Sequence, residues 1–212
     1  MAKLFYKTCR HGNVGSNVMF HNKDEFGYGT NLKNLEVYTK EEAQEYMDRQ
    51  DGSLMLLKSE VDKLAVKHVD MQYLDETKGG PSKLNDLCVV QINGNYDGND
   101  IKFCGELGST FDLSKARVIS HQEALLFVRD GMTIWSASYL ESISRYTFQA
   151  GNINKRKMIT AGGVRYRTPR ASRTTGKARG NCPTCGKITW DFNPYENAYC
   201  QDHDDTQDNW SY

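Results

Sequence analysis

The sequence predicts an α+β fold, in which two small, related α+β lobes are followed by a basic extended linker and a small cysteine-containing module. Three observations lead to this prediction: a collinear internal repeat, a run of Lys and Arg without acidic residues, and two pairs of metal-binding residue types near the C-terminus. A length of 212 residues suits one large domain or two small ones with an appendage, and the 38% hydrophobic content predicts a core that is modest or split.

The repeat relates residues 30–47 to residues 110–128, and residues 51–65 to residues 130–144. In the first pair, matches recur at one constant offset: Leu32 with Leu113, Val37 with Val118, Thr39 with Ser120, Glu42 with Glu123, and Ala43 with Ala124. A collinear series of this kind indicates an internal duplication. We therefore expect repeat 1 at residues 1–80 and repeat 2 at residues 81–150, joined through a polar stretch.

Helix starts are marked in both repeats by a hydroxyl residue followed three positions later by an acid. Thr-x-x-Glu at 39–42 and Ser-x-x-Glu at 120–123 are capping-box patterns. In a capping box the hydroxyl accepts a hydrogen bond from the third helical amide, and the acid accepts one from the backbone amide of the hydroxyl residue. Ser59–Asp62 and Ser138–Glu141 are weaker versions and predict the starts of a second helix in each repeat.

A strand is predicted after the first helix of each repeat. Asp-Gly precedes the apolar runs at 53–57 and 132–136, which predicts a turn and then a buried strand. Each repeat is accordingly expected to contain two N-terminal strands, a short strand, a helix, a strand and a helix.

The formal net charge of zero conceals a strong segregation. Residues 145–190 contain eleven Lys and Arg and no acid, whereas residues 1–144 carry a net charge of −5 and residues 191–212 a net charge of −6. Residues 151–180 are rich in Gly, Ser, Thr, Pro and Arg, so we expect a basic linker that is extended when free. Such segregation indicates a segment that meets an anion.

Nucleic acid is one partner that suits this segment, because Tyr166 between two arginines fits phosphate contact combined with base stacking. An acidic protein surface is a second possible partner. In a third interpretation the segment is an inert linker whose cations pair with the acidic lobes or the acidic tail. The predicted nucleic-acid-binding residues are Lys155, Arg156, Lys157, Arg165, Tyr166, Arg167, Arg170, Arg173, Lys177 and Arg179.

The C-terminal pairs are Cys182-x-x-Cys185, followed by Gly186, and Cys200-x-x-His203. Two sulfurs on one tight turn with glycine after them are typical of a metal-binding knuckle. Residues 188–192 and 197–199 are expected to pair as strands around a turn at 193–196. A closed Cys3His set predicts structural Zn²⁺, which a module of this size needs to fold. A redox-active Cys182–Cys185 pair is the alternative, although no βαβ pattern surrounds it.

With this knuckle and hairpin, residues 181–205 resemble the zinc-ribbon class. The resemblance implies a binding module for nucleic acid or protein, followed by an acidic tail at 206–212. The module departs from the four-cysteine form, and its own acidic residues make it a poor phosphate binder, so the basic segment is expected to contact phosphates.

A second resemblance concerns residues 26–47, "FGYGTNLKNLEVYTKEEAQEYM". The stretch resembles small bacteriophage accessory proteins with a glycine-tyrosine turn, a short strand and a helix that opens with Tyr-Thr-x-x-Glu-Ala. This resemblance implies a phage origin and a non-enzymatic role.

Catalytic motifs give little support for an enzyme. Phosphate-binding loops, His-Glu-x-x-His and nucleophile elbows are absent from the sequence. Cys9, His11 and His21 are close enough in sequence for a Cys–His pair with an activated thiolate, but positions in a strand and a loop explain them as well. Asp97 and Asp100 lie near glycines, and their spacing fits a turn better than a cation-binding loop.

We therefore expect a non-enzymatic, phage-encoded accessory protein that binds nucleic acid or a nucleic-acid machine, such as a host transcription or defence complex. A nucleic-acid-processing enzyme with a site hidden in the lobes and a virion or assembly component are the alternatives. The sequence contains no apolar run long enough to span a bilayer, and its first residues do not resemble a secretory signal. A cytoplasmic location, in the host if phage-encoded, is the expectation.

Overall fold

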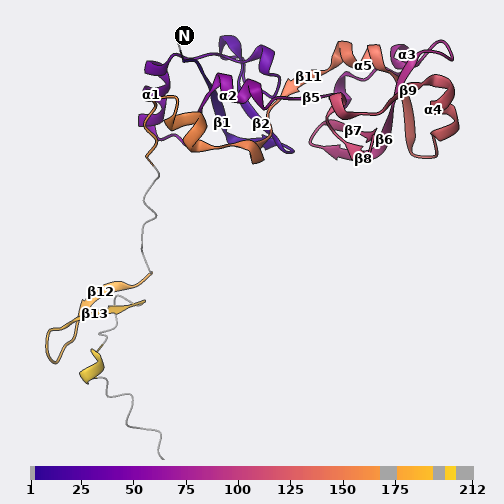
Figure 1. Cartoon of the computed structure of the whole chain (residues 1–212). Helices are drawn as coiled ribbons and strands as arrows, with labels where there is room; N and C mark the ends of the chain where they lie inside the picture. The colour runs from indigo at the N-terminus through magenta and orange to yellow at the C-terminus, as the bar shows by residue number, and fades with distance from the viewer. Residues whose placement is uncertain (1–2, 168–175, 193–198, 204–212) are drawn as a thin grey trace, which may run out of the picture. The chain divides into compact units, whose positions relative to one another are not determined.

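The computed structural model describes residues 3–167, 176–192 and 199–203, and the chain divides into two units after Tyr166 (Figure 1). Unit 1, up to Tyr166, is a mixed α+β assembly. Its strands are β1 (Phe5–Val14), β2 (Asn17–His21), β3 (Tyr28–Gly29), β4 (Met55–Leu57), β5 (Val66–His68), β6 (Leu87–Asp97), β7 (Asp100–Gly105), β8 (Gly108–Thr110), β9 (Val118–Ser120), β10 (Met132–Ser136) and β11 (Arg145–Thr147). Its α-helices are α1 (Lys40–Arg49), α2 (Lys58–Lys63), α3 (Glu76–Gly79), α4 (His121–Phe127) and α5 (Ala137–Ile143).

Short helical turns connect these elements. Five are 3-10 turns, at Lys23–Glu25, Leu32–Asn34, Met71–Tyr73, Leu113–Lys115 and Ala150–Asn152, and one is a π-helix at Arg156–Thr160. All strand pairs are antiparallel. One sheet has the order β3-β2-β1-β4 and another the order β10-β6-β7-β8 with β9 also on β6, while β5 and β11 form a separate pair.

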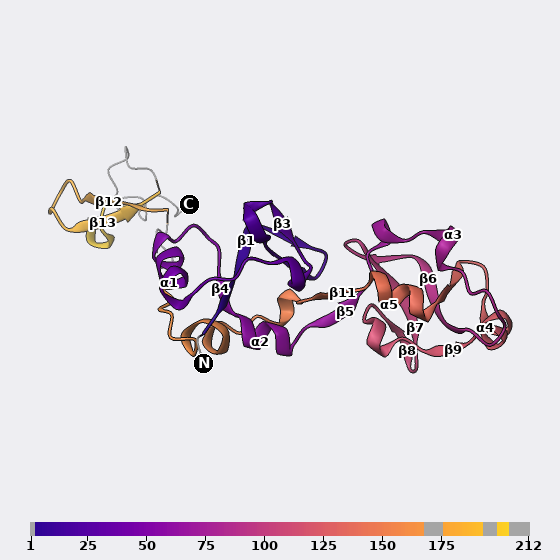
Figure 2. The same cartoon turned by 90° about the horizontal axis from the view of Figure 1, so that it is seen from above.

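The same order of elements occurs in both halves of unit 1. A long hairpin, a short strand, a 3-10 turn, a helix, a strand and a second helix run from β1 to α2, and again from β6 to α5; the first group adds a 3-10 turn before its short strand, and the second group adds β9 before its first helix. We call the first group lobe 1 and the second group lobe 2 (Figure 2). The expected order of strands and helices therefore agrees with the structure, apart from the additional strand β9 in lobe 2. The strand after the Asp-Gly turn is largely buried in lobe 1, whereas in lobe 2 only Trp135 of β10 is buried and its other residues are half-buried.

The capping boxes that begin the first helix of each lobe are confirmed. Thr39 Oγ1 accepts from the Glu42 amide at 3.3 Å, and Glu42 Oε2 accepts from the Thr39 amide at 2.7 Å. Ser120 and Glu123 form the same reciprocal pair before α4. Because the orphan amides of the first turn have partners, the helices begin where the pattern predicts.

The weaker caps predicted for the second helices are wrong. Helix α2 begins at Lys58 with Leu57 at the N-cap, and α5 begins at Ala137 with Ser136 at the N-cap, and neither N-cap side chain makes a capping bond. In each lobe the strand continues directly into the helix. In lobe 1 the Lys58 amide donates to the Leu4 carbonyl at 2.8 Å, so one of the free amides at the start of α2 has a backbone partner instead of a hydroxyl cap.

Each half of the chain also contributes a short arm to the other lobe. Strands β5 and β11 lie side by side in both views, with Lys67 opposite Tyr146 (Figures 1 and 2). Beyond β5, the Val69 carbonyl accepts from the Ile101 amide in lobe 2 at 3.0 Å; beyond β11, the Phe148 carbonyl accepts from the Val18 amide in lobe 1 at 2.8 Å. Val69 and Phe148 are fully buried in the lobe that each joins. The two lobes therefore exchange arms reciprocally.

The turns of the two long hairpins contact each other at the same junction. Gly15 has φ +58° and Gly98 has φ +63°. A Cβ at Gly15 would lie 2.4 Å from the Gly98 amide nitrogen, and a Cβ at Gly98 would lie 2.8 Å from the Gly15 amide nitrogen. Side chains at either position would push the turns apart, so glycine is required on both sides.

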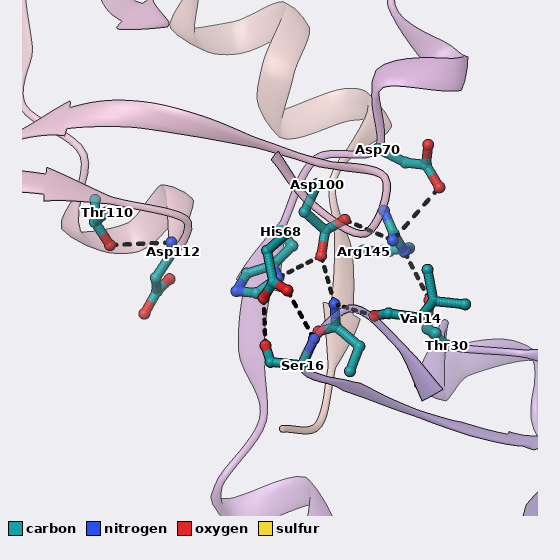
Figure 3. A network of polar contacts seen from close by, with 11 residues as sticks. Val14, Ser16, Thr30, His68, Asp70, Asp100, Thr110, Asp112 and Arg145 are labelled. Carbon is teal, nitrogen blue, oxygen red and sulfur yellow. Dashed lines mark hydrogen bonds and ion pairs between the residues drawn. The ribbon is translucent and has the colours of Figure 1, made fainter. Parts of the chain in front are cut away.

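A buried ionic cluster fills the rest of the junction (Figure 3). Asp100 at the start of β7 accepts from Arg145 Nη2 at 2.6 Å and from Asn17 Nδ2 at 2.8 Å, and its second oxygen also lies 2.6 Å from His68 Nδ1. Arg145 donates through Nε to Thr30 Oγ1 at 3.1 Å. Asp100, His68 and Arg145 are buried, and the charges of Asp100 and Arg145 are paired with each other, which is the condition under which buried charge is tolerated. Arg145 Nη1 and Asn17 Oδ1 are buried without a hydrogen-bond partner.

Part of the expected basic linker at 151–180 is folded instead. Met158, Ile159 and Val164 are buried in the core of lobe 1, and the Arg165 amide donates to Gln44 Oε1 of α1 at 2.8 Å. These three apolar residues lie among many cations in the sequence. The composition of the segment therefore predicts a solvated linker, although the three side chains are buried in the core. Among the described residues, no helix combines the length and apolar character needed to cross a bilayer.

Candidate metal centre

The four predicted metal ligands in unit 2 come together. One ligand atom from each of Cys182, Cys185, Cys200 and His203 lies within 4.8 Å of all the others. Cys185 Sγ lies 3.5 Å from Cys200 Sγ, and Cys200 Sγ lies 3.2 Å from His203 Nδ1. Tetrahedral zinc with normal bond lengths would separate two sulfurs by about 3.8 Å and a sulfur from a nitrogen by about 3.6 Å. The donor set and its dimensions therefore fit a metal ion of this kind.

The first pair of ligands lies on a tight turn. The Gly186 amide donates to the Cys182 carbonyl at 2.8 Å, and the Cys182 amide donates to the Lys187 carbonyl at 2.8 Å. Gly186 has φ +73°, a conformation that residues with a side chain rarely adopt. The cysteine spacing and the glycine after it thus produce the predicted knuckle.

The knuckle joins two strands, β12 (Ala178–Asn181) and β13 (Ile188–Asp191), which pair in an antiparallel register. The predicted strand at 188–192 is present as β13, but β12 is not its predicted partner. The predicted partner at 197–199 falls mostly outside the described residues, and 178–181 lies in the predicted basic linker. The nearer strand pairs because the knuckle itself closes the hairpin, which costs little loop entropy.

The second pair of ligands lies on a 3-10 turn at Gln201–His203, where the His203 amide donates to the Cys200 carbonyl at 2.8 Å. Beside it, Lys187 of the knuckle forms an ion pair with Asp202 at 2.5 Å. The two turns are thus linked by a salt bridge in addition to the ligand cluster.

The electrostatic environment of the cluster favours thiolate at one position. Backbone amides, that of Cys200 first and then those of Cys185 and Thr184, lower the pKa of the Cys182 thiol to about 6. Desolvation, followed by the neighbouring Cys185 side chain, raises the pKa of Cys200. Because thiolates bind metal, amides aimed at Cys182 prepare the site for a cation.

The predicted cationic residues divide between the two units. Lys155, Arg156, Lys157 and Arg165 are exposed in unit 1; Arg167, Lys177 and Arg179 are exposed in unit 2; and Arg170 and Arg173 lie outside the described residues. Half-buried Tyr166 packs on the core of lobe 1, and its hydroxyl accepts from Lys155 Nζ at 2.8 Å. These residues are therefore not a single surface within one unit.

The other residues considered for catalysis have structural partners. The Cys9 sulfur accepts from the His11 amide at 3.3 Å, while the His11 ring accepts from Arg10 at 3.2 Å, so the thiol and the imidazole are engaged separately. Asp97 accepts from the Ser16 amide at 2.7 Å, and Asp100 belongs to the ionic cluster. Both aspartates therefore hold the lobe junction.

No protein-family model, curated protein or solved structure matches this chain. The geometry of the site is therefore the basis for assigning it a role.

Proposed function

We propose that this protein is a non-enzymatic accessory protein that binds nucleic acid through its cationic segment and a zinc-stabilised module. Zn²⁺ is the metal we assign to the cluster, because three cysteines and one histidine are its preferred donors and fill four positions. Bound zinc would supply a structural crosslink and no open position for a reacting water. Residues 181–205 would then act as a zinc ribbon.

The observation that carries the nucleic-acid assignment is the charge segregation along the chain. Nine Lys and Arg occur between residues 155 and 179 without an acidic residue. The described members are exposed, in contrast to Arg145, which the ionic cluster neutralises. Exposed cations on consecutive segments suit a polyanion, whose phosphates release counterions when they are contacted.

Salt dependence of binding tests this proposal. Affinity of the full chain for a labelled 20-nucleotide single strand and for the corresponding duplex would be measured by fluorescence anisotropy over a range of salt concentrations. If seven cations meet phosphates, the logarithm of affinity should fall with the logarithm of salt at a slope near −6 on duplex and about −5 on single strand.

Neutralising variants sharpen the test. Replacing Lys155, Arg156 and Lys157 together with Gln should make the single-strand slope less steep by about 2. The matched control replaces Lys63, Lys83 and Arg129, three exposed cations of unit 1, with Gln and should leave the slope unchanged. Equal slopes for both triple variants, or no binding by the wild-type chain at low salt, would contradict the proposal. The proposal would also be contradicted if the full chain bound an acidic protein but neither of the two nucleic acids.

We also propose that the two lobes arose by duplication of one α+β unit. The sequence matches, the common order of elements and the reciprocal arms support this origin. In the β5–β11 pair, Arg145 faces His68 and Thr147 faces Val66, as expected for one strand paired with its own copy. The fused lobes would then form a scaffold to which the binding module is covalently joined.

A further inference from the structure

One face of the β12–β13 hairpin carries a row of exposed apolar side chains. Ile188, Trp190 and Phe192 are 54%, 58% and 69% exposed, whereas Thr189 between the first two is 8% exposed. Side chains alternate between the faces of a strand, so residues two apart share a face. Ile188 and Trp190 therefore share one face of β13, and buried Thr189 points to the other side. Phe192 lies one residue beyond the strand, and its ring lies beside Lys177.

Cations lie along the same row. Arg179 is directly opposite Trp190 in the strand register, and directly opposite residues in an antiparallel pair share a face. At the end of the hairpin, Lys177 Nζ lies 5.1 Å from the centre of the Phe192 ring. Both aromatic rings therefore have a positive neighbour on the exposed face.

The acids that the structure describes near this face do not cancel its charge. Asp191 follows Trp190, so alternation places its side chain on the opposite face. Asp202 is occupied by its ion pair with Lys187. On this face the described acidic side chains are directed elsewhere or paired.

We propose that this face is a stacking platform for single-stranded nucleic acid. Bases would stack on Trp190 and Phe192, while Arg179 and Lys177 would contact the adjoining phosphates. A single strand is the fitting occupant, because the rings need base faces that a duplex keeps covered. This proposal rests on the proposed nucleic-acid function and adds to it the residues that contact bases.

The platform is held by the knuckle. Cys182 and Lys187 close the hairpin with an amide-to-carbonyl bond, and the ligands Cys182 and Cys185 lie within this turn. Metal binding would therefore fix the strand register that places Arg179 beside Trp190. Rigid aromatic rings lose little conformational entropy when a base stacks on them.

The test measures affinity of the full chain for a 20-nucleotide oligothymidylate. Trp190→Ala and Phe192→Ala should each weaken binding by roughly 5- to 150-fold, the range for loss of one stacked base. Trp190→Phe should retain most of the affinity, because it keeps an aromatic face. Phe26→Ala, which removes an 82% exposed aromatic ring from unit 1, is the matched control and should bind like wild type.

A second readout separates stacking from loss of structure. Binding of the oligonucleotide should quench part of the tryptophan fluorescence of the wild-type chain. This part should be absent in Trp190→Phe although that variant still binds. Each variant should also contain as much zinc per chain as wild type, which shows that the module has kept its fold.

The outcomes distinguish this proposal from the function on which it rests. Steep salt dependence in wild type with unchanged affinity in Trp190→Ala and Phe192→Ala would overturn the platform and leave the cationic segment in place. Absence of oligonucleotide binding by wild type would overturn both. Equal affinity for single strand and duplex would also overturn the platform.

Discussion

Arg145 and Asp100 decide the energetics of the lobe junction at the level of single residues. Replacing Arg145 with Met should lower the free energy of unfolding by about 3–5 kcal/mol, because Asp100 would remain buried without its cation. Urea unfolding of the full chain measures this change.

A matched control comes from Lys67, which pairs with Glu141 at 2.8 Å in a more exposed position. Lys67→Met should cost about 1 kcal/mol or less, since exposed pairs contribute little. If both substitutions cost the same, the cluster would not be a special determinant of stability.

Glu42 should make the stability of the protein depend on pH. Hydrogen bonds from the Thr39 amide and hydroxyl lower the pKa of the Glu42 carboxyl below its ordinary value of 4.5. The stabilisation is therefore present above pH 4.5 and is lost as pH falls through the lowered pKa. Glu42→Gln should be less stable than wild type at pH 7, and this difference should shrink towards pH 3.

The control for this effect is Glu41→Gln, which removes the same charge from the same first turn without touching the capping box. Chemical unfolding at several pH values compares the two variants. A stability difference between Glu42→Gln and wild type that is constant from pH 7 to pH 3 would contradict the assignment.

The hairpin turns present a test at the level of elements. Gly98→Ala should destabilise unit 1 by more than Gly94→Ala. Both positions have positive φ, +63° and +75°, so both substitutions introduce backbone strain of about 1 kcal/mol or more. A Cβ at Gly94 meets nothing within 4 Å, whereas one at Gly98 meets Val14 and the backbone of Gly15.

Urea unfolding again supplies the measurement. The excess cost of Gly98→Ala over Gly94→Ala reports the contact between the two hairpin turns. Equal costs would mean that the turns separate without loss, and that the junction depends on the arms and the ionic cluster alone.

Elements with local signals could be predicted from the sequence, and elements made by distant pairing could not. In the capping boxes at Thr39 and Ser120, both hydrogen-bonding partners lie within four residues of sequence, so the pattern can be recognised locally. The β5–β11 pair joins segments almost eighty residues apart, and the residues of neither segment predict that it pairs with the other. Likewise, Met158 and Ile159 reach the core from within a cationic stretch, so their burial depends on where lobe 1 lies.

The same distinction applies to the metal site. The spacing of Cys182 and Cys185 predicts both the knuckle and the ligands, because a tight turn is local. The aromatic row was missed although Ile188, Trp190 and Phe192 alternate in the sequence. Alternating apolar residues ordinarily indicate a buried face, and their exposure becomes evident only once the strand partner and the burial of Thr189 are known.

For the whole molecule, metal removal should affect the two units differently. Unit 2 has a two-stranded sheet and the ligand cluster, whereas unit 1 has its own cores. A chelator should release one zinc per chain and abolish protection of the backbone amides in residues 176–192. Amides of β1 and β6 should remain protected.

Hydrogen exchange with and without chelator measures this contrast. Exchange that stays slow in residues 176–192 after zinc is removed would show that the hairpin is ordered without metal. Accelerated exchange in both units would instead show that their stabilities are coupled.

The reciprocal arms have a consequence for a chain that is severed. Residues 80–86 connect the halves on the exposed surface, so a protease site inserted there would yield fragments that each retain the strand completing the other. The cleaved halves should elute together in native buffer and come apart only in denaturant. Continuity of the polypeptide would then matter for assembling unit 1, but not for keeping it whole.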